Sequence, residues 1–131
     1  MLKKEKDIFY WSPFTSKVAT VFSVINSAEI INKYSSKSGL RAFIIDAVKE
    51  WEAYRKDINS RDIKIINLNR NSIFNNFKKD GFLKSRFAYW YIFFKSFFRL
   101  HHLIKKQKPE FLIIHLITSL PLILFSINNY Q

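Results

Sequence analysis

The first candidate for chemistry is a single histidine near the C-terminal end of the sequence. His115 stands inside the uncharged stretch FLIIHLITSLPLILF, which begins at Phe111. A histidine titrates close to neutral pH, so it can carry a proton or contact a phosphate. If the preceding residues form a parallel strand, His115 lies at the carboxyl end of that strand, where open α/β sheets bind ligands. The alternative is a hydrogen-bonded histidine in the core.

A second group of candidates follows the apolar run DIFYW near the N-terminus. Ser16, Lys17 and Thr20 fall in the segment that should lead from a strand into a helix. Backbone amides at the start of a helix favour an anion such as phosphate, and these three side chains could add donors. The alternative is that they only cap the helix. The segment contains no glycine, and side chains hinder a close approach of the backbone to a ligand.

The most unusual segment is KSRFAYWYIFFKSFFRLHHLIKK, in which eight aromatic residues fall between Phe87 and Phe98. Its basic side chains recur at helical spacing and would form one stripe: Lys95, Arg99, His102 and Lys106. Aromatic residues beside lysine and arginine suit contact with an anionic membrane surface. The alternative is a helix packed on the sheet with a solvated basic face. Nucleic-acid stacking is a third, less favoured interpretation.

Several kinds of site are not expected. The chain has no cysteine, which excludes disulfides and thiolate metal sites. The neighbouring His101 and His102 would point to different faces of a helix, so they are not a metal pair, and we expect no metal and no cofactor. No P-loop, HExxH or GxSxG motif occurs. The carboxylates Asp46, Glu50 and Glu52 are interpreted as surface groups, although Asp46 ends an expected strand.

Composition limits the architecture and the partners. A chain of 131 residues is at most one domain, and its 48% of apolar residues can form a core. The net charge of +12 favours polyanions, which include nucleic acid, an anionic membrane and phosphorylated substrates. A biased genome composition would also raise the number of lysines. The N-terminus does not resemble a signal peptide, because its apolar run is short and ends at Ser12-Pro13.

The order of apolar runs predicts an α/β fold, in which helices cover a parallel sheet. A first helix should follow the first strand and end near Gly39, a short charged helix should follow the second strand, and a long helix should cover Ser85–Lys106. The expected strands, in the sheet order 3-2-1-4, are Asp7–Trp11, Leu40–Ile45, Ile63–Leu68 and Phe111–Ile117.

The uncharged segment Phe111–Ile127 could instead be a membrane span. A spanning helix needs about 20 apolar residues, and this segment is shorter and is interrupted by Thr118, Ser119 and Pro121. A strand, a turn and the start of a helix explain the same residues better, because proline is favoured in the first turn of a helix. We therefore expect a strand here.

The segment KPEFLIIHLITSLP resembles the (R/K)-P-D-hydrophobic-hydrophobic-H-x-H segment of GT-B glycosyltransferases of family 4. Glu110 takes the place of the aspartate, His115 that of the second histidine, and Ile113 stands where the family has the first. The segment IFYWSPFTSKVATVFSVINSAEIINKY is similar to the family's opening strand, loop and helix, with TSKVAT in place of a Gly-Gly pair. The resemblance covers nearly the whole chain. It implies the Rossmann-like N-terminal half of a GT-B fold, on the acceptor side.

The resemblance also implies an activity. Such an enzyme transfers a sugar from a nucleotide-sugar, which is a substrate and not a cofactor, to a polysaccharide or a lipid-linked acceptor. His115 would be catalytic, and Ser16, Lys17 and Thr20 would bind the acceptor or a phosphate. Residues 1–131 would be a partial N-terminal domain, inactive without a second domain that carries the donor site and a Glu-x7-Glu element.

The location and the alternatives follow from the same residues. The protein is expected in the cytoplasm, or peripheral on the cytoplasmic face of a membrane that Lys95, Arg99 and Lys106 contact. Nucleic acid is not the expected partner. Two alternatives stay open, a basic module without enzymatic activity that binds nucleic acid, and a small membrane-anchored protein.

Overall fold

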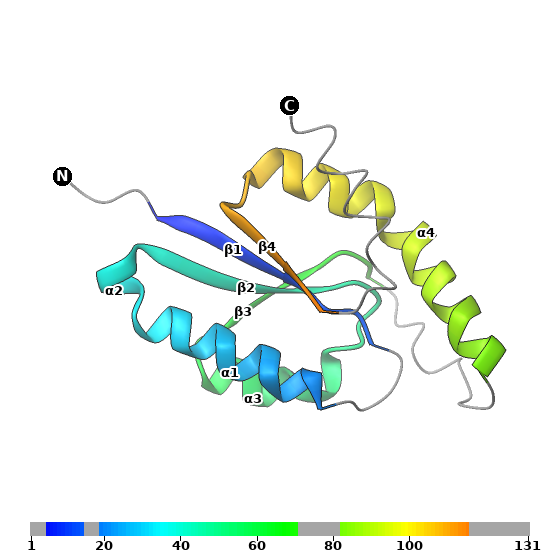
Figure 1. Cartoon of the computed structure of the whole chain (residues 1–131), viewed down its shortest axis with the longest axis horizontal. Helices are drawn as coiled ribbons and strands as arrows, with labels where there is room; N and C mark the ends of the chain where they lie inside the picture. Colours follow the sequence, from blue (N-terminus) through cyan, green and yellow to red (C-terminus); the bar gives the residue numbers. More distant parts are fainter. Residues whose placement is uncertain (1–4, 15–18, 71–81, 116–131) are drawn as a thin grey trace.

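The computed structural model describes residues 5–14, 19–70 and 82–115, which form a sheet with helices on both faces (Figure 1). All paired strands are parallel, and their order is β3-β2-β1-β4. The predicted fold class and strand order are therefore confirmed. The strands are β1 (Lys6–Trp11), β2 (Leu40–Asp46), β3 (Lys64–Asn67) and β4 (Phe111–Ile114).

The central strand explains why the apolar runs do not alternate with polar residues. β1 pairs with β2 from Lys6↔Leu40 to Trp11↔Ile45, and with β4 along its last four residues. Successive side chains of a strand point to opposite faces, and both faces of this sheet are covered. Phe9, Tyr10 and Trp11 are consequently all fully buried.

One face of the sheet is covered by α1 (Thr20–Lys33), with the short α2 (Ser35–Ser38), the 3-10 turn η1 (Glu52–Tyr54) and α3 (Arg55–Ser60). Gly39 closes α2 in the left-handed conformation, with φ 71°, as the predicted turn requires. The buried residues of α1 recur at helical spacing and form one inward stripe: Val21, Val24, Ile25 and Ala28.

The other face is covered by α4 (Phe82–Gln107), which lies across the sheet from α1 (Figure 1). α4 begins three residues earlier than the predicted helix and ends one residue later. Its buried residues recur every four positions and pack toward the sheet: Ala88, Ile92, Ser96, Leu100 and Ile104.

The segment that could have spanned a membrane contains a strand. β4 occupies Phe111–Ile114 and pairs in parallel with β1, so Phe111–Ile127 is not one continuous helix. The alternative of a spanning helix at this segment is wrong, and the strand prediction is confirmed for its first four residues. Positions 116–127 lie outside the described residues. In the described part of the chain, no helix is long and apolar enough to cross a membrane.

Candidate functional site

Polar residues gather at the carboxyl edge of the sheet. Ser12 follows β1, Asp46 ends β2, Asn67 ends β3 and His115 follows β4. Because the strands are parallel, these four positions lie along one edge. The chain runs from β1 to β2 on one side and reaches β4 on the other, so the strand order reverses between β1 and β4. Open α/β sheets bind ligands at such a point.

His115 lies beside this reversal point. Its backbone N–H donates a hydrogen bond to the carbonyl of Trp11, at 3.0 Å. Its imidazole ring stacks on Tyr10, with ring centroids 6.3 Å apart and an interplanar angle of 22°. The Tyr10 and Ser27 hydroxyls share a hydrogen bond of 2.5 Å, which fixes the tyrosine against α1. The ring of the half-buried His115 therefore packs against Tyr10 at the carboxyl end of its strand, which is where the sequence predicted this residue.

The predicted phosphate-binding residues are described only in part. α1 begins at the half-buried Thr20, and Ala19 at its N-cap makes no side-chain capping hydrogen bond. Ser16 and Lys17 lie outside the described residues, so their predicted contact with a phosphate or acceptor stays a prediction. Thr20 belongs to the same end of the sheet as His115, because α1 follows the carboxyl end of β1.

The prediction of surface carboxylates is wrong for Asp46 and Glu50, which are both buried. The loop after β2 folds back on itself, and both carboxylate oxygens of Glu50 accept backbone hydrogen bonds. The amide of Ala47 donates at 3.1 Å, and that of Val48 at 2.7 Å. A buried carboxyl that organises a loop in this way leaves no signal in hydrophobic periodicity. Glu52 is exposed, as predicted.

Asp46 and Glu50 form a coupled pair of carboxyls. The backbone amides of Lys49 and Trp51 face the Asp46 carboxyl and favour its charged form. Burial raises the pKa of Glu50 well above its ordinary value, and the neighbouring Asp46 carboxyl raises that pKa further. Burial also raises the pKa of Asp46, although the neighbouring Glu50 counteracts part of this rise. The two buried carboxyls therefore bind a proton more readily than two separate surface carboxyls would.

The loop after β2 is strained at one residue. Lys49 has φ 64°, a left-handed conformation that is uncommon for a residue with a side chain and costs roughly 1 kcal/mol. The hydrogen bonds of the neighbouring Glu50 hold the loop in this shape. Strain of this kind concentrates at functional sites, and here the strained residue Lys49 lines a pocket.

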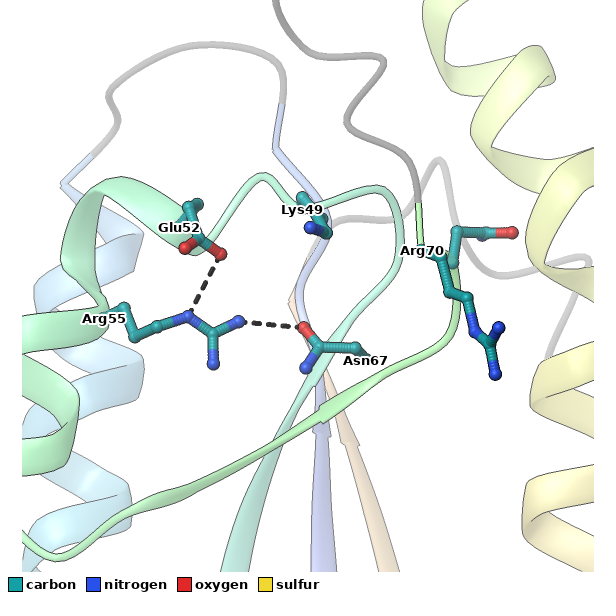
Figure 2. Close-up of a pocket in the computed structure, with 6 residues that line it drawn as sticks. Lys49, Glu52, Arg55, Asn67 and Arg70 are labelled. Atoms are coloured by element: carbon teal, nitrogen blue, oxygen red, sulfur yellow. Dashed lines mark hydrogen bonds and ion pairs between the residues drawn. The ribbon is translucent and has the colours of Figure 1, made fainter.

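That pocket lies beyond the carboxyl ends of β2 and β3 and has a volume of about 490 Å³. It is open to solvent, and three of its side chains are cationic while one is a carboxylate. Arg55 is held in place, because it donates to Glu52 Oε2 and to Asn67 Oδ1, both at 3.0 Å (Figure 2). Its lining residues are Lys49, Glu52, Arg55, Asn67, Asn69 and Arg70.

The two sides of the pocket come from different elements. Arg70 follows β3 and lies across the pocket from Arg55 (Figure 2). The side chain of the buried Asn69 donates to the carbonyl of Ala47 at 2.6 Å, which ties the ends of β2 and β3 together. Sequence reasoning missed this pocket, since its cations are separated in the chain and only the fold brings them together. Its charge and its fixed guanidinium suit an anionic group.

The predicted basic stripe of α4 is divided in the structure. Arg99 donates a hydrogen bond to the carbonyl of Leu68, so it anchors α4 to the chain after β3. The ammonium group of Lys95 lies 5.9 Å from the ring centroid of Tyr91. Lys106 is exposed beside Lys108, near the amino ends of β1 and β4. The three residues therefore do not share one environment.

Comparisons of the chain with protein-family models, with curated proteins and with solved structures found no match. The resemblance to GT-B glycosyltransferases stays a prediction. In the part of the chain that the structure describes, no three histidine or carboxylate side chains are grouped so that they could hold a metal ion.

Proposed function

We propose that this chain is the acceptor-side domain of a GT-B sugar transferase. The enzyme moves a glycosyl group from a nucleotide-sugar to a hydroxyl of a polysaccharide or lipid-linked acceptor. The observation that carries the proposal is the position of His115, which follows β4 at the reversal point of a β3-β2-β1-β4 sheet. The resemblance of KPEFLIIHLITSLP to the family's strand and histidine supports it.

His115 would act on the acceptor. In the transfer, the acceptor oxygen forms a bond to the anomeric carbon of the sugar, and the bond from that carbon to the diphosphate breaks. The nucleoside diphosphate leaves with the electron pair, and the acceptor hydroxyl loses its proton. A neutral imidazole held at a fixed position can accept that proton, and the stacking on Tyr10 supplies the fixed position.

The other polar groups of this edge would hold phosphates. The start of α1 at Thr20 offers backbone amides, and Ser16 and Lys17 precede it in the sequence. The pocket with Lys49, Arg55 and Arg70 would take a phosphate of the acceptor. In the same proposal, a second domain supplies the nucleotide-sugar site, and the enzyme acts in the cytoplasm or at the cytoplasmic face of a membrane.

A transfer assay on the whole protein as the cell makes it tests the proposal. Labelled nucleotide-sugars are supplied in turn, and incorporation into lipid-linked and polysaccharide fractions is measured. We expect His115→Gln to lower the transfer rate by roughly a hundredfold or more, which is the usual contribution of general base catalysis. The matched control is His102→Gln, because His102 is exposed on α4, away from this edge.

Two results would contradict the proposal. The first is a folded His115→Gln protein that transfers sugar at the wild-type rate, with folding checked by circular dichroism. The second is no transfer from any nucleotide-sugar by the wild-type protein in the presence of its own membranes.

A further inference from the structure

α4 exposes large aromatic rings that the fold does not use. Four of its aromatic side chains are more than half exposed, and they recur at spacings of three, four and four residues along one face of the helix. We call them the aromatic face of α4: Phe87 (70% exposed), Trp90 (57%), Phe94 (66%) and Phe98 (77%).

Three of these four rings are connected through ring contacts that include the half-buried Phe93 and Phe97. Trp90 stacks on Phe94 with ring centroids 5.9 Å apart, and Phe93 bridges to both. Phe87 and Phe98 are eleven residues apart, which is about 16 Å along a helix. The opposite side of α4 packs on the sheet, so the aromatic face is not required for the core. An exposed apolar surface of this kind marks an interaction site.

The charge of α4 indicates the kind of partner. The helix contains six lysines and arginines and no aspartate or glutamate. Lys95, Lys105 and Lys106 are exposed, whereas Arg99 is held by the carbonyl of Leu68. Phenylalanine and tryptophan beside a row of cations are typical of helices that lie in the interface of an anionic membrane.

We propose that the aromatic face of α4 inserts into the interface of an anionic lipid membrane, with Lys95, Lys105 and Lys106 contacting lipid phosphates. The helix lies flat, since its rings follow its length on one side. The contact differs from the sequence expectation, because the rings supply the insertion and Arg99 serves the fold. The proposal is independent of the sugar transferase activity, because it uses only the outer face of α4.

Two other partners fit this surface less well. A second copy of the chain would bring the exposed lysines of one α4 near those of the other, in molecules that each carry a net charge of +12. Single-stranded nucleic acid is bound in grooves that follow its backbone, whereas the aromatic face is the convex side of one helix. Both are outcomes of the test below.

Tryptophan fluorescence tests the insertion directly. The chain has three tryptophans, of which Trp11 and Trp51 are fully buried and Trp90 is exposed. Adding vesicles of phosphatidylglycerol and phosphatidylcholine should shift the emission of Trp90 to shorter wavelength, and brominated lipid should quench it. Vesicles of phosphatidylcholine alone should give a much weaker response, and salt should reduce the response to anionic vesicles.

Matched variants distinguish insertion of the aromatic face from nonspecific binding through other exposed apolar side chains. Phe87→Ser/Phe94→Ser/Phe98→Ser keeps Trp90 as the reporter and should abolish the shift. The control Phe22→Ser/Ile30→Ser/Tyr34→Ser replaces three similarly exposed side chains, two on α1 and one directly after it, and should retain it.

The charge variants are matched in the same way. Lys95→Glu/Lys105→Glu/Lys106→Glu should weaken binding to anionic vesicles by roughly a hundredfold or more. The control makes the same change of net charge at exposed lysines on the other side of the sheet, and it should lose much less: Lys33→Glu/Lys37→Glu/Lys56→Glu.

Four results would overturn the proposal. They are no Trp90 shift with anionic vesicles, an equal loss in both charge variants, a shift with single-stranded DNA or RNA but not with vesicles, and a concentration-dependent shift without lipid that is accompanied by dimers in light scattering. A loss of the vesicle response that is confined to the α4 variants supports it.

Discussion

The two faces of the sheet are covered by helices of opposite character. α1 turns its buried stripe to the sheet, and its outer side is tied to the end of α3, where Arg61 donates to Glu29 of α1 and to Asp57 of α3. α4 is apolar around most of its circumference, with rings on the side away from the sheet and a buried serine, Ser96, on the side toward it. α1 also exposes Phe22 and Ile30, but these stand eight positions apart, and single exposed apolar side chains are normal on a protein surface.

The α4 side needs another explanation. A helix that covers a sheet requires only one apolar stripe, and additional exposed rings lower solubility. Among the described residues, the aromatic face of α4 is not required for the core, so it is available for the membrane contact proposed above. The comparison of the two helices therefore distinguishes side chains that stabilise the fold from side chains that we propose contact a partner.

The largest expected effect is on the free energy of unfolding, and it tests whether side chains of the two helices have these different roles. Ile25 on α1 is fully buried, so Ile25→Ala should lower the free energy of unfolding by about 2–5 kcal/mol. Phe94 on α4 is mostly exposed, so Phe94→Ala should change the same quantity by no more than about 0.5 kcal/mol. Urea unfolding measures both. If Phe94→Ala were as destabilising as Ile25→Ala, the aromatic face would belong to the core and the comparison would fail.

The next effect concerns the loop that connects the two sides. Val48 packs in the cluster under α4 and Trp51 in the cluster under α1, and Glu50 between them holds the loop. Glu50→Ala would leave two buried amides without an acceptor, at about 1–3 kcal/mol each. The matched control is Glu52→Ala, which removes only a surface ion pair with Arg55 and should change the free energy of unfolding by less than about 1 kcal/mol. Similar losses in both variants would show that the loop does not depend on Glu50.

A pH dependence follows from the raised pKa values of Asp46 and Glu50. A carboxyl whose pKa is higher in the folded state binds its proton more tightly there, so it stabilises the fold most below its ordinary pKa of about 4. This contribution is lost as the pH rises through the raised pKa of Glu50. The contribution of the pair to the free energy of unfolding should therefore decrease as the pH increases above about 4. The contribution of an ordinary surface carboxylate changes in the opposite direction.

Urea unfolding at a series of pH values measures this slope. Asp46→Asn/Glu50→Gln removes both titrating groups and keeps side chains of similar shape. The difference between the wild-type curve and that of the double variant isolates the pair. A difference that rises with pH would mean that the two carboxyls are charged in the folded protein.

The fold was largely predictable from the sequence because its signals are local. Ile8–Trp11 and Phe43–Ile45 are apolar at consecutive positions, which indicates strands buried on both faces, and Gly39 marks a turn. His115 was predictable for the same reason, since it directly follows an apolar run. Element ends were less accurate, as the three-residue difference at the start of α4 illustrates.

The remaining parts of the site depend on contacts between distant residues. The burial of Glu50 requires the left-handed backbone of Lys49, which hydrophobic patterning does not encode. Arg99 and Lys95 both belong to the predicted basic stripe, and the sequence does not show that Arg99 reaches the carbonyl of Leu68. In α4, apolar residues occur on every side of the helix, so the sequence could not show which rings face the sheet.

The smallest effect compares one serine from each helix. On α1, the Ser27 hydroxyl bonds to that of Tyr10, so Ser27→Ala should lower the free energy of unfolding by about 1 kcal/mol. On α4, the Ser96 hydroxyl is buried and has no hydrogen-bond partner among the residues that the structure describes. Ser96→Ala removes a buried polar group and introduces the best helix former, so it should raise the free energy of unfolding by about 0.5–1 kcal/mol.

Thermal unfolding resolves changes of this size and of opposite sign. If Ser96→Ala lowered the melting temperature as Ser27→Ala does, the Ser96 hydroxyl would have a partner that stabilises the packing of α4. An increase would show instead that the inward side of α4 is not optimised for stability, whereas that of α1 is. The two helices would then differ on their inner sides as well as on their outer ones, and the weaker packing would belong to the helix that carries the aromatic face.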